Sequence, residues 1–157
     1  MNNTKIGFIG LGNVGGKLAG NLARNDINLA IRDLNSDLEA PLIAMGATRA
    51  ASPLDMMRSV DVVITCLPSP AASARVLEAP DGILAGLRPG QIWLEMSTTD
   101  SAEVQRLGAL VEAQGGMAPG SGAPDFSTAR AGWQSRTIKT VSPWTGHSAE
   151  RCVTRRL

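Results

Sequence analysis

Residues 6–22 read Ile-Gly-Phe-Ile-Gly-Leu-Gly-Asn-Val-Gly-Gly-Lys-Leu-Ala-Gly-Asn-Leu. Mostly apolar residues over 5–9 predict a short strand at the start of this stretch. Three glycines then follow at the spacing Gly-x-Gly-x-x-Gly. Apolar residues recur every four positions over 13–24, which predicts a helix. A glycine loop between a strand and a helix is typical of the first turn of a βαβ unit that binds a dinucleotide.

The three glycines have separate roles in such a loop. Gly10 allows the tight turn after the strand, Gly12 lets the backbone approach a pyrophosphate, and Gly15 lets the helix pack close to the strand. Free N–H groups and the positive end of the helix dipole then bind phosphate. The expected cofactor-binding residues of the loop are Gly10, Leu11, Gly12, Asn13, Val14 and Gly15. The alternative is a glycine-rich turn with a structural role alone.

Asp33 lies eighteen residues after Gly15, at the end of a second apolar stretch, 28–32. A carboxylate at this position can accept hydrogen bonds from the adenosine ribose hydroxyls and would repel a 2′-phosphate. The sequence therefore favours NAD over NADP as the cofactor. Arg32 is adjacent, but neighbours on a strand point to opposite faces, so we expect Arg32 to lie outside the ribose site. Asp33 could otherwise serve only as a turn former.

Predicted strands and helices alternate through the first 116 residues. Residues 60–67 are nearly all apolar after Asp61, which is typical of a strand buried on both faces. The alternation predicts an α/β fold of the Rossmann type, a doubly wound parallel sheet with its ligand at the carboxyl ends of the strands. The expected strands are 5–9, 28–32, 47–49, 60–67 and 91–96, and the expected helices are 13–24, 37–45, 53–58, 70–77, 82–87 and 101–113.

Composition excludes several other classes of protein. The chain has 157 residues, enough for one domain with a substantial core, and its formal net charge of +1 argues against nucleic-acid binding. Two cysteines and one histidine offer no disulfide framework and no metal site. No apolar run reaches the roughly 18 residues of a membrane span, and no signal peptide precedes the first strand. We therefore expect a cytoplasmic protein without metal or membrane contact.

Residues 8–22 match two apolar residues followed by Gly-Leu-Gly-x-Met-Gly-x-x-Met-Ala-x-Asn-Leu, except that Val14 and Leu18 replace the methionines. The similarity continues in segments 61–68, 81–90 and 95–99. Over 5–116 the chain resembles the β-hydroxyacid dehydrogenase family, which includes 3-hydroxyisobutyrate dehydrogenase and tartronate semialdehyde reductase. The resemblance implies a Rossmann domain that binds NAD(P) and serves an oxidoreductase acting on the CH–OH group of a small β-hydroxyacid.

The resemblance also implies further site residues. Leu67 and Pro68 correspond to the family's loop over the cofactor, and Thr98, with Ser97 beside it, corresponds to a segment near the nicotinamide and substrate. Alternatively, residues 97–100 could only cap the next helix, and both roles could also hold together. Ser121 matches a family serine that binds the substrate carboxylate, but the residues around it depart from the family motif, which favours an ordinary loop serine.

Residues 117–157 differ in pattern from the predicted NAD(P)-binding domain, 1–116. Glycine, proline, serine, threonine and arginine dominate, and basic residues outnumber acidic ones. The family has a helical C-terminal domain with a catalytic lysine here, whereas Lys139 lacks a helical pattern and an asparagine four residues later. We therefore expect no catalytic residue in this chain. The tail is expected to be irregular, either a natural disordered segment or the result of out-of-frame translation or truncation.

The sequence is compatible with three functions. The first is a β-hydroxyacid dehydrogenase that exchanges hydride between NAD and its small-molecule substrate. The second is a truncated fragment that binds dinucleotide without turnover, and the third is an interaction module that has kept only the fold. The missing lysine motif favours the second over the first, and the intact glycine loop with Asp33 favours the second over the third. The sequence identifies neither the hydroxyacid nor an oligomeric state.

Overall fold

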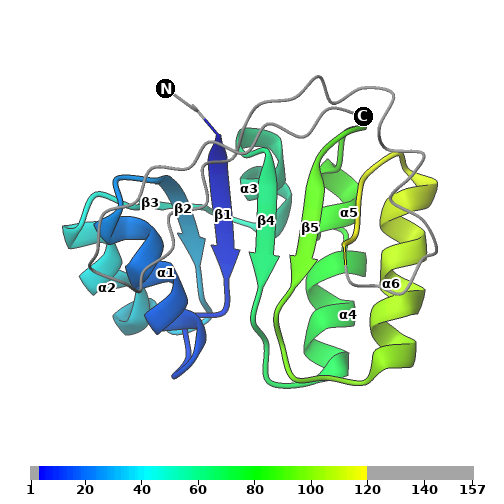
Figure 1. Cartoon of the computed structure of the whole chain (residues 1–157), viewed down its shortest axis with the longest axis horizontal. Coiled ribbons are helices and arrows are strands. Elements are labelled where there is room, and N and C mark those ends of the chain that lie inside the picture. Colours follow the sequence, from blue (N-terminus) through cyan, green and yellow to red (C-terminus); the bar gives the residue numbers. More distant parts are fainter. Residues whose placement is uncertain (1–3, 120–157) are drawn as a thin grey trace, which may run out of the picture. The chain divides into compact units, whose positions relative to one another are not determined.

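The structure, a computed structural model, describes residues 4–119, which form a parallel sheet of five strands with helices around it (Figure 1). The strands are β1 (Lys5–Ile9), β2 (Asn28–Arg32), β3 (Thr48–Arg49), β4 (Val62–Thr65) and β5 (Ile92–Glu95). Their order across the sheet is β3-β2-β1-β4-β5, and every neighbouring pair is parallel. The predicted Rossmann-type parallel sheet is therefore confirmed.

The helices of the described residues form two groups. They are α1 (Gly15–Arg24), α2 (Ser36–Ala44), α3 (Pro53–Ser59), α4 (Pro70–Glu78), α5 (Ile83–Gly86) and α6 (Ser101–Ala113). In the first group α1 packs against α2, and in the second α3 and α4 pack against α5 while α6 packs against α4. Every predicted strand and helix is present, with ends that differ by at most two residues.

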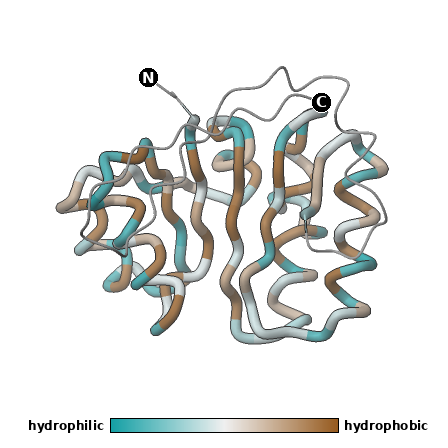
Figure 2. Tube along the Cα trace, in the orientation of Figure 1, coloured by the Kyte–Doolittle hydropathy of each residue, from teal (hydrophilic) through white to brown (hydrophobic). Residues whose placement is uncertain are grey.

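Alternate residues of the strands contribute to two hydrophobic cores. Phe8 and Ile31 lie in a core with residues of α1 and α2, whereas Ile9 and Val63 lie in a core with residues of α3 to α6. Neighbouring side chains on a strand point to opposite faces, so each helix group covers one face, as a doubly wound sheet requires. The tube in Figure 2 shows hydrophobic residues concentrated along the central strands.

After α6 the chain returns to the sheet beside β5. The Met117 N–H donates to the Gln91 carbonyl at 2.9 Å, and the Trp93 N–H donates to the Met117 carbonyl at 2.9 Å, which makes a parallel bridge between Met117 and Ile92. Ala118 is buried in the core that contains α6. Packed structure thus continues past residue 116. The tail predicted over 117–157 lies outside the described residues from residue 120 onward.

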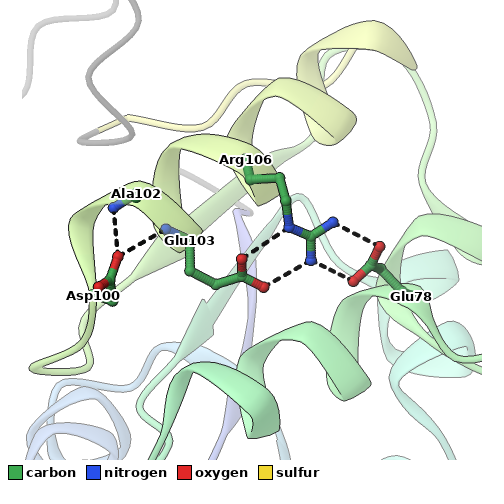
Figure 3. Close-up of polar contacts among 5 residues, drawn as sticks. All are labelled: Glu78, Asp100, Ala102, Glu103 and Arg106. Carbon is green, nitrogen blue, oxygen red and sulfur yellow. Dashed lines mark hydrogen bonds and ion pairs between the residues drawn. The ribbon is translucent and has the colours of Figure 1, made fainter.

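Arg106 of α6 connects this helix to α4 (Figure 3). Its guanidinium donates to both carboxylate oxygens of Glu78, at 2.7 and 2.9 Å, and to both of Glu103, at 2.7 and 2.8 Å. Asp100 caps α6 by accepting from the N–H groups of Ala102 and Glu103. The Glu103 carboxylate accepts from Arg106 and does not take part in capping α6.

We expect the Arg106 network to lose its stabilising effect in acid. Hydrogen bonds from Arg106 hold the pKa of Glu78 and that of Glu103 below their ordinary values. A carboxyl group with a lowered folded-state pKa stabilises the fold above its unfolded pKa, about 4.3 for Glu, and this contribution is lost as pH falls through the folded pKa. Replacing Arg106 by glutamine should therefore reduce the fall in melting temperature on acidification below about pH 5.

The matched control is Arg58→Gln, which removes the same charge from an exposed pair with Asp55 at 3.9 Å. This variant should retain the wild-type dependence of melting temperature on pH. Equal pH dependence in wild type, Arg106→Gln and Arg58→Gln would contradict the assignment to Arg106.

Candidate functional site

The carboxyl ends of the strands bring the predicted site residues of the described region to one edge of the sheet. β1 and β4 are neighbours, and from them the sheet extends in opposite directions, to β2 and to β5. In sheets of this type the ligand lies at such a switch point, outside the carboxyl ends. Gly10 follows β1, Asp33 follows β2, Leu67 and Pro68 follow β4, and Thr98 follows β5.

The glycine loop requires glycine at two of its three motif positions. Gly10 has a φ of +94°, which other residues rarely adopt, and a Cβ there would lie 2.2 Å from the Cys66 carbonyl oxygen. A Cβ on Gly15 would lie 1.9 Å from the Gly10 carbonyl oxygen. By contrast, a Cβ on Gly12 would meet no atom of the described residues within 4 Å. Gly10 and Gly15 thus close the turn, while Gly12 leaves space that a ligand can enter.

α1 begins at this loop without a side-chain cap. Val14 occupies the N-cap position and its side chain makes no capping hydrogen bond, and no acidic residue lies in the first turn. The starts of α2, α3 and α4, in contrast, are capped by Asn35, Ser52 and Ser69. The positive end of the α1 dipole is therefore left for an anionic ligand. With the space in front of Gly12, this end of α1 fits a pyrophosphate group.

Asp33 is hydrogen-bonded to the glycine loop. Its Oδ2 accepts from the Leu11 N–H at 2.6 Å, and its Oδ1 accepts from the Asn35 N–H at 2.8 Å. The Asp33 N–H donates in turn to Oε1 of Glu39 at 2.9 Å. Both the carboxylate and the backbone of Asp33 are thus held beside the loop. Sequence analysis missed Glu39, whose one signal is a charged residue among the apolar positions of α2.

Ser97 connects the turns that follow β4 and β5. Its Oγ accepts from the Leu67 N–H at 2.6 Å and donates to Oε1 of Glu95, which also accepts from the Ser97 N–H at 2.9 Å. The other oxygen of Glu95, Oε2, is buried without a hydrogen-bond partner among the described residues. Ser97 therefore positions the Leu67 turn rather than capping α6. Pro68 and Thr98 lie exposed on the same two turns.

Cys66 lies between the glycine loop and the end of β5. Burial and the nearby Glu95 carboxylate raise the pKa of the Cys66 thiol above its ordinary value, so the thiol is neutral at pH 7 and is a poor nucleophile. Residues 4–119 contain no group of three or more histidine, cysteine or acidic residues able to hold a metal ion. Ser121 and Lys139 lie outside the described residues, and their roles stay predictions.

Replacing Ser97 by alanine should loosen the Leu67 turn. The substitution removes the acceptor of the Leu67 N–H and a donor to Glu95, both part-buried. A fully buried polar group left unpaired costs about 1–3 kcal/mol, which is the upper limit here. We expect a lower melting temperature and faster hydrogen exchange at the Leu67 amide. Ser101→Ala, at an exposed position, is the control and should change neither quantity. Unaltered exchange at Leu67 in the Ser97 variant would rule out this role.

The chain matches, over residues 5–124, the family model described as the NAD binding domain of 6-phosphogluconate dehydrogenase. It is 36% identical over 107 residues to the probable mitochondrial 3-hydroxyisobutyrate dehydrogenase of Dictyostelium discoideum, a match that covers 68% of this chain and 33% of that protein. It is 30% identical over 126 residues to the cytokine-like nuclear factor N-PAC of Homo sapiens, which covers 78% of this chain and 23% of that protein.

A solved structure of Psf3 in complex with NADP+ and 2-OPP has a similar fold. The TM-score is 0.69 at 28% sequence identity, and the match covers 72% of this chain and 40% of that one. The chain thus spans a third or less of the length of the two relatives named above and less than half of Psf3. Within residues 4–119, no helix is long and apolar enough to cross a membrane.

Proposed function

Because the chain belongs to the family of the NAD binding domain of 6-phosphogluconate dehydrogenase, we propose that residues 5–119 bind NAD along the carboxyl edge of the sheet. The similarity to a probable 3-hydroxyisobutyrate dehydrogenase agrees with the predicted resemblance to the β-hydroxyacid dehydrogenases. The pyrophosphate would lie against Gly12 and the start of α1, and the adenosine ribose against Asp33. The observation that carries this proposal is the open space at Gly12 beside an uncapped helix start. Both features favour a bound diphosphate.

The preference for NAD over NADP rests on the Asp33 carboxylate. Its two oxygens can accept from the ribose hydroxyls, and its negative charge opposes a 2′-phosphate. Psf3, a structural relative of this chain, was solved with NADP+, so relatives with this fold also take the phosphorylated cofactor. The discriminating quantity is therefore the ratio of the dissociation constants of this protein for NADPH and NADH.

The reaction that such a site serves is hydride exchange between the nicotinamide and the CH–OH carbon of a small β-hydroxyacid. The similarity to a probable 3-hydroxyisobutyrate dehydrogenase supports this substrate class. The turn with Ser97 and Thr98 would lie near the nicotinamide and orient it. Lys5 and Lys17, the two lysines of the described residues, lie on β1 and on α1. The described residues would therefore supply binding and orientation, with Lys5 at the start of β1 and Lys17 exposed in the first turn of α1 beside the glycine loop.

Calorimetric titration with NADH tests the binding proposal. We expect one nucleotide per chain, with NADPH binding more weakly than NADH. If neither NADH nor NADPH binds to the folded protein, the proposal fails. Tighter binding of NADPH would retain the site but reverse the cofactor preference.

A screen of turnover with NAD and 3-hydroxyacids distinguishes an active dehydrogenase from a domain that binds the dinucleotide without turnover. Binding without turnover is expected, since the described residues contain no candidate for the catalytic acid. Clear turnover would mean that a residue outside 4–119 completes the active site. A second candidate function is a module that retains the fold for interaction. The similarity to N-PAC, which is named as a nuclear factor and not as an enzyme, is consistent with it, and absence of nucleotide binding would favour it.

A further inference from the structure

Glu39 is the one charged residue among the fully buried residues that the structure describes. It lies on α2 and is 2% exposed. A buried carboxylate is costly unless hydrogen bonds or an opposite charge compensate it. The stability of the buried Glu39 carboxylate therefore depends on its hydrogen-bond and ion-pair partners.

The partners of Glu39 come from the ends of two neighbouring strands. One carboxylate oxygen, Oε1, accepts from the Asp33 N–H at 2.9 Å, and the other, Oε2, forms an ion pair with Nη2 of Arg49 on β3. One carboxylate thus joins the backbone of the proposed ribose-binding residue to a guanidinium. Because β3 pairs with β2 through Ile31 and Arg49, both partners are positioned by the sheet itself.

Arg49 is the cation that the Glu39 carboxylate holds in an ion pair. Its side chain is 52% exposed, whereas that of Glu39 is 3% exposed, so the guanidinium lies at the surface with one side on a buried carboxylate. Arginine binds phosphate through two parallel hydrogen bonds, and an arginine near the ribose is what accommodates the 2′-phosphate of NADP in Rossmann folds. A second arginine near Asp33, Arg32, is held by a hydrogen bond from Nη1 to the Ala50 carbonyl at 3.3 Å.

We propose that Glu39 is a positioning residue for cofactor specificity: it fixes the Asp33 backbone and holds the Arg49 guanidinium so that it does not bind a 2′-phosphate. This inference rests on the proposed function, because it assumes that Asp33 binds the adenosine ribose. It goes beyond that function by assigning discrimination against NADP to a pair of residues that do not touch the cofactor. The Asp33 carboxylate repels the 2′-phosphate, and the Glu39 carboxylate holds the Arg49 guanidinium that would otherwise attract this phosphate.

Glu39→Gln is the variant that tests the proposal most directly. The amide oxygen can still accept from the Asp33 N–H, but the amide nitrogen faces the guanidinium donor to donor, which releases Arg49. We expect the ratio of the NADPH dissociation constant to the NADH dissociation constant to fall about tenfold, the effect of one charge-assisted contact. The double variant E39Q/R49M removes the released cation and should return the ratio to the wild-type value.

Arg58→Met is the matched control for the charge change, since Arg58 is exposed and pairs with Asp55 at 3.9 Å. It should leave the ratio unchanged. If E39Q does not fold, the comparison moves to E39M/R49K against E39M/R49M, in which an apolar residue replaces the buried carboxylate. The ratio is then expected to be lower in the lysine variant than in the methionine variant.

The outcomes separate this inference from the proposed function. Failure of the wild-type protein to bind either NADH or NADPH would overturn the proposed function and this inference with it. Binding of NADH by wild type with an unchanged ratio in folded E39Q would overturn the role of Glu39 alone. A purely structural role predicts that E39Q weakens NADH and NADPH equally, which also overturns the specificity role.

Discussion

Gly12→Ala is expected to weaken NADH binding by at least about 100-fold while the protein keeps its wild-type melting temperature. A Cβ at this position meets no atom of the described residues within 4 Å, so the folded chain accommodates it. The same Cβ would occupy the space through which the backbone approaches the pyrophosphate. A 100-fold loss corresponds to about 2.7 kcal/mol, which is reasonable for displacing a diphosphate from several N–H donors.

Gly15→Ala is the contrasting variant and should fail for a different reason. Its Cβ would lie 1.9 Å from the Gly10 carbonyl oxygen, a contact with backbone that cannot rotate away. We expect a loss of about 3 kcal/mol or more of unfolding free energy, because overpacking against fixed atoms forces the chain to move. Calorimetry and thermal melts on both variants separate the two effects. If Gly12→Ala binds NADH with the wild-type dissociation constant, the pyrophosphate does not lie against Gly12.

Asp33→Ala is expected to weaken NADH binding roughly 10- to 100-fold. The variant loses the carboxylate that would accept from the ribose hydroxyls, and this loss corresponds to about 1.4–2.7 kcal/mol, the size of one hydrogen bond to a charged group. It also loses the acceptors of the Leu11 and Asn35 N–H groups, so the glycine loop becomes less fixed. NADPH binding should weaken less than NADH binding, because the charge that opposes a 2′-phosphate is gone.

Asp37→Asn serves as the control for Asp33→Ala. Asp37 is an exposed acid in the first turn of α2, four residues along the chain. Its loss should leave the dissociation constant of NADH unchanged and lower the melting temperature only slightly, by the small interaction of an acid with the helix dipole. Equal NADH binding by wild type and Asp33→Ala would contradict the proposal that Asp33 binds the adenosine ribose.

Much of the fold could be predicted from the sequence because local patterns and burial agree. Strands buried on both faces require continuous apolar runs, and the run over 60–67 contains β4. The glycine loop was predictable for a steric reason, since Gly10 and Gly15 each have a backbone oxygen where a Cβ would be. The position of Asp33 beside the glycine loop was predictable because it depends on the end of β2 alone.

Glu39 and its partner Arg49 were not predictable in the same way. They are ten residues apart on a helix and a strand, and neither periodicity nor spacing indicates that one carboxylate binds both Arg49 and the Asp33 N–H. The link from Ser97 to Leu67 depends likewise on β4 and β5 lying side by side. These contacts follow from strand order and register, which the patterns of single segments do not contain.

The return of the chain beside β5 has a consequence for aggregation. The outer strands of an open sheet present unpaired N–H and C=O groups on which another chain can form a further strand. At one side of this sheet β3 has only two residues, Thr48–Arg49, which is too short to act as a template. At the other side Met117 hydrogen-bonds to Gln91 and Trp93. The described domain thus limits strand addition by shortness at one edge and by its own chain at the other.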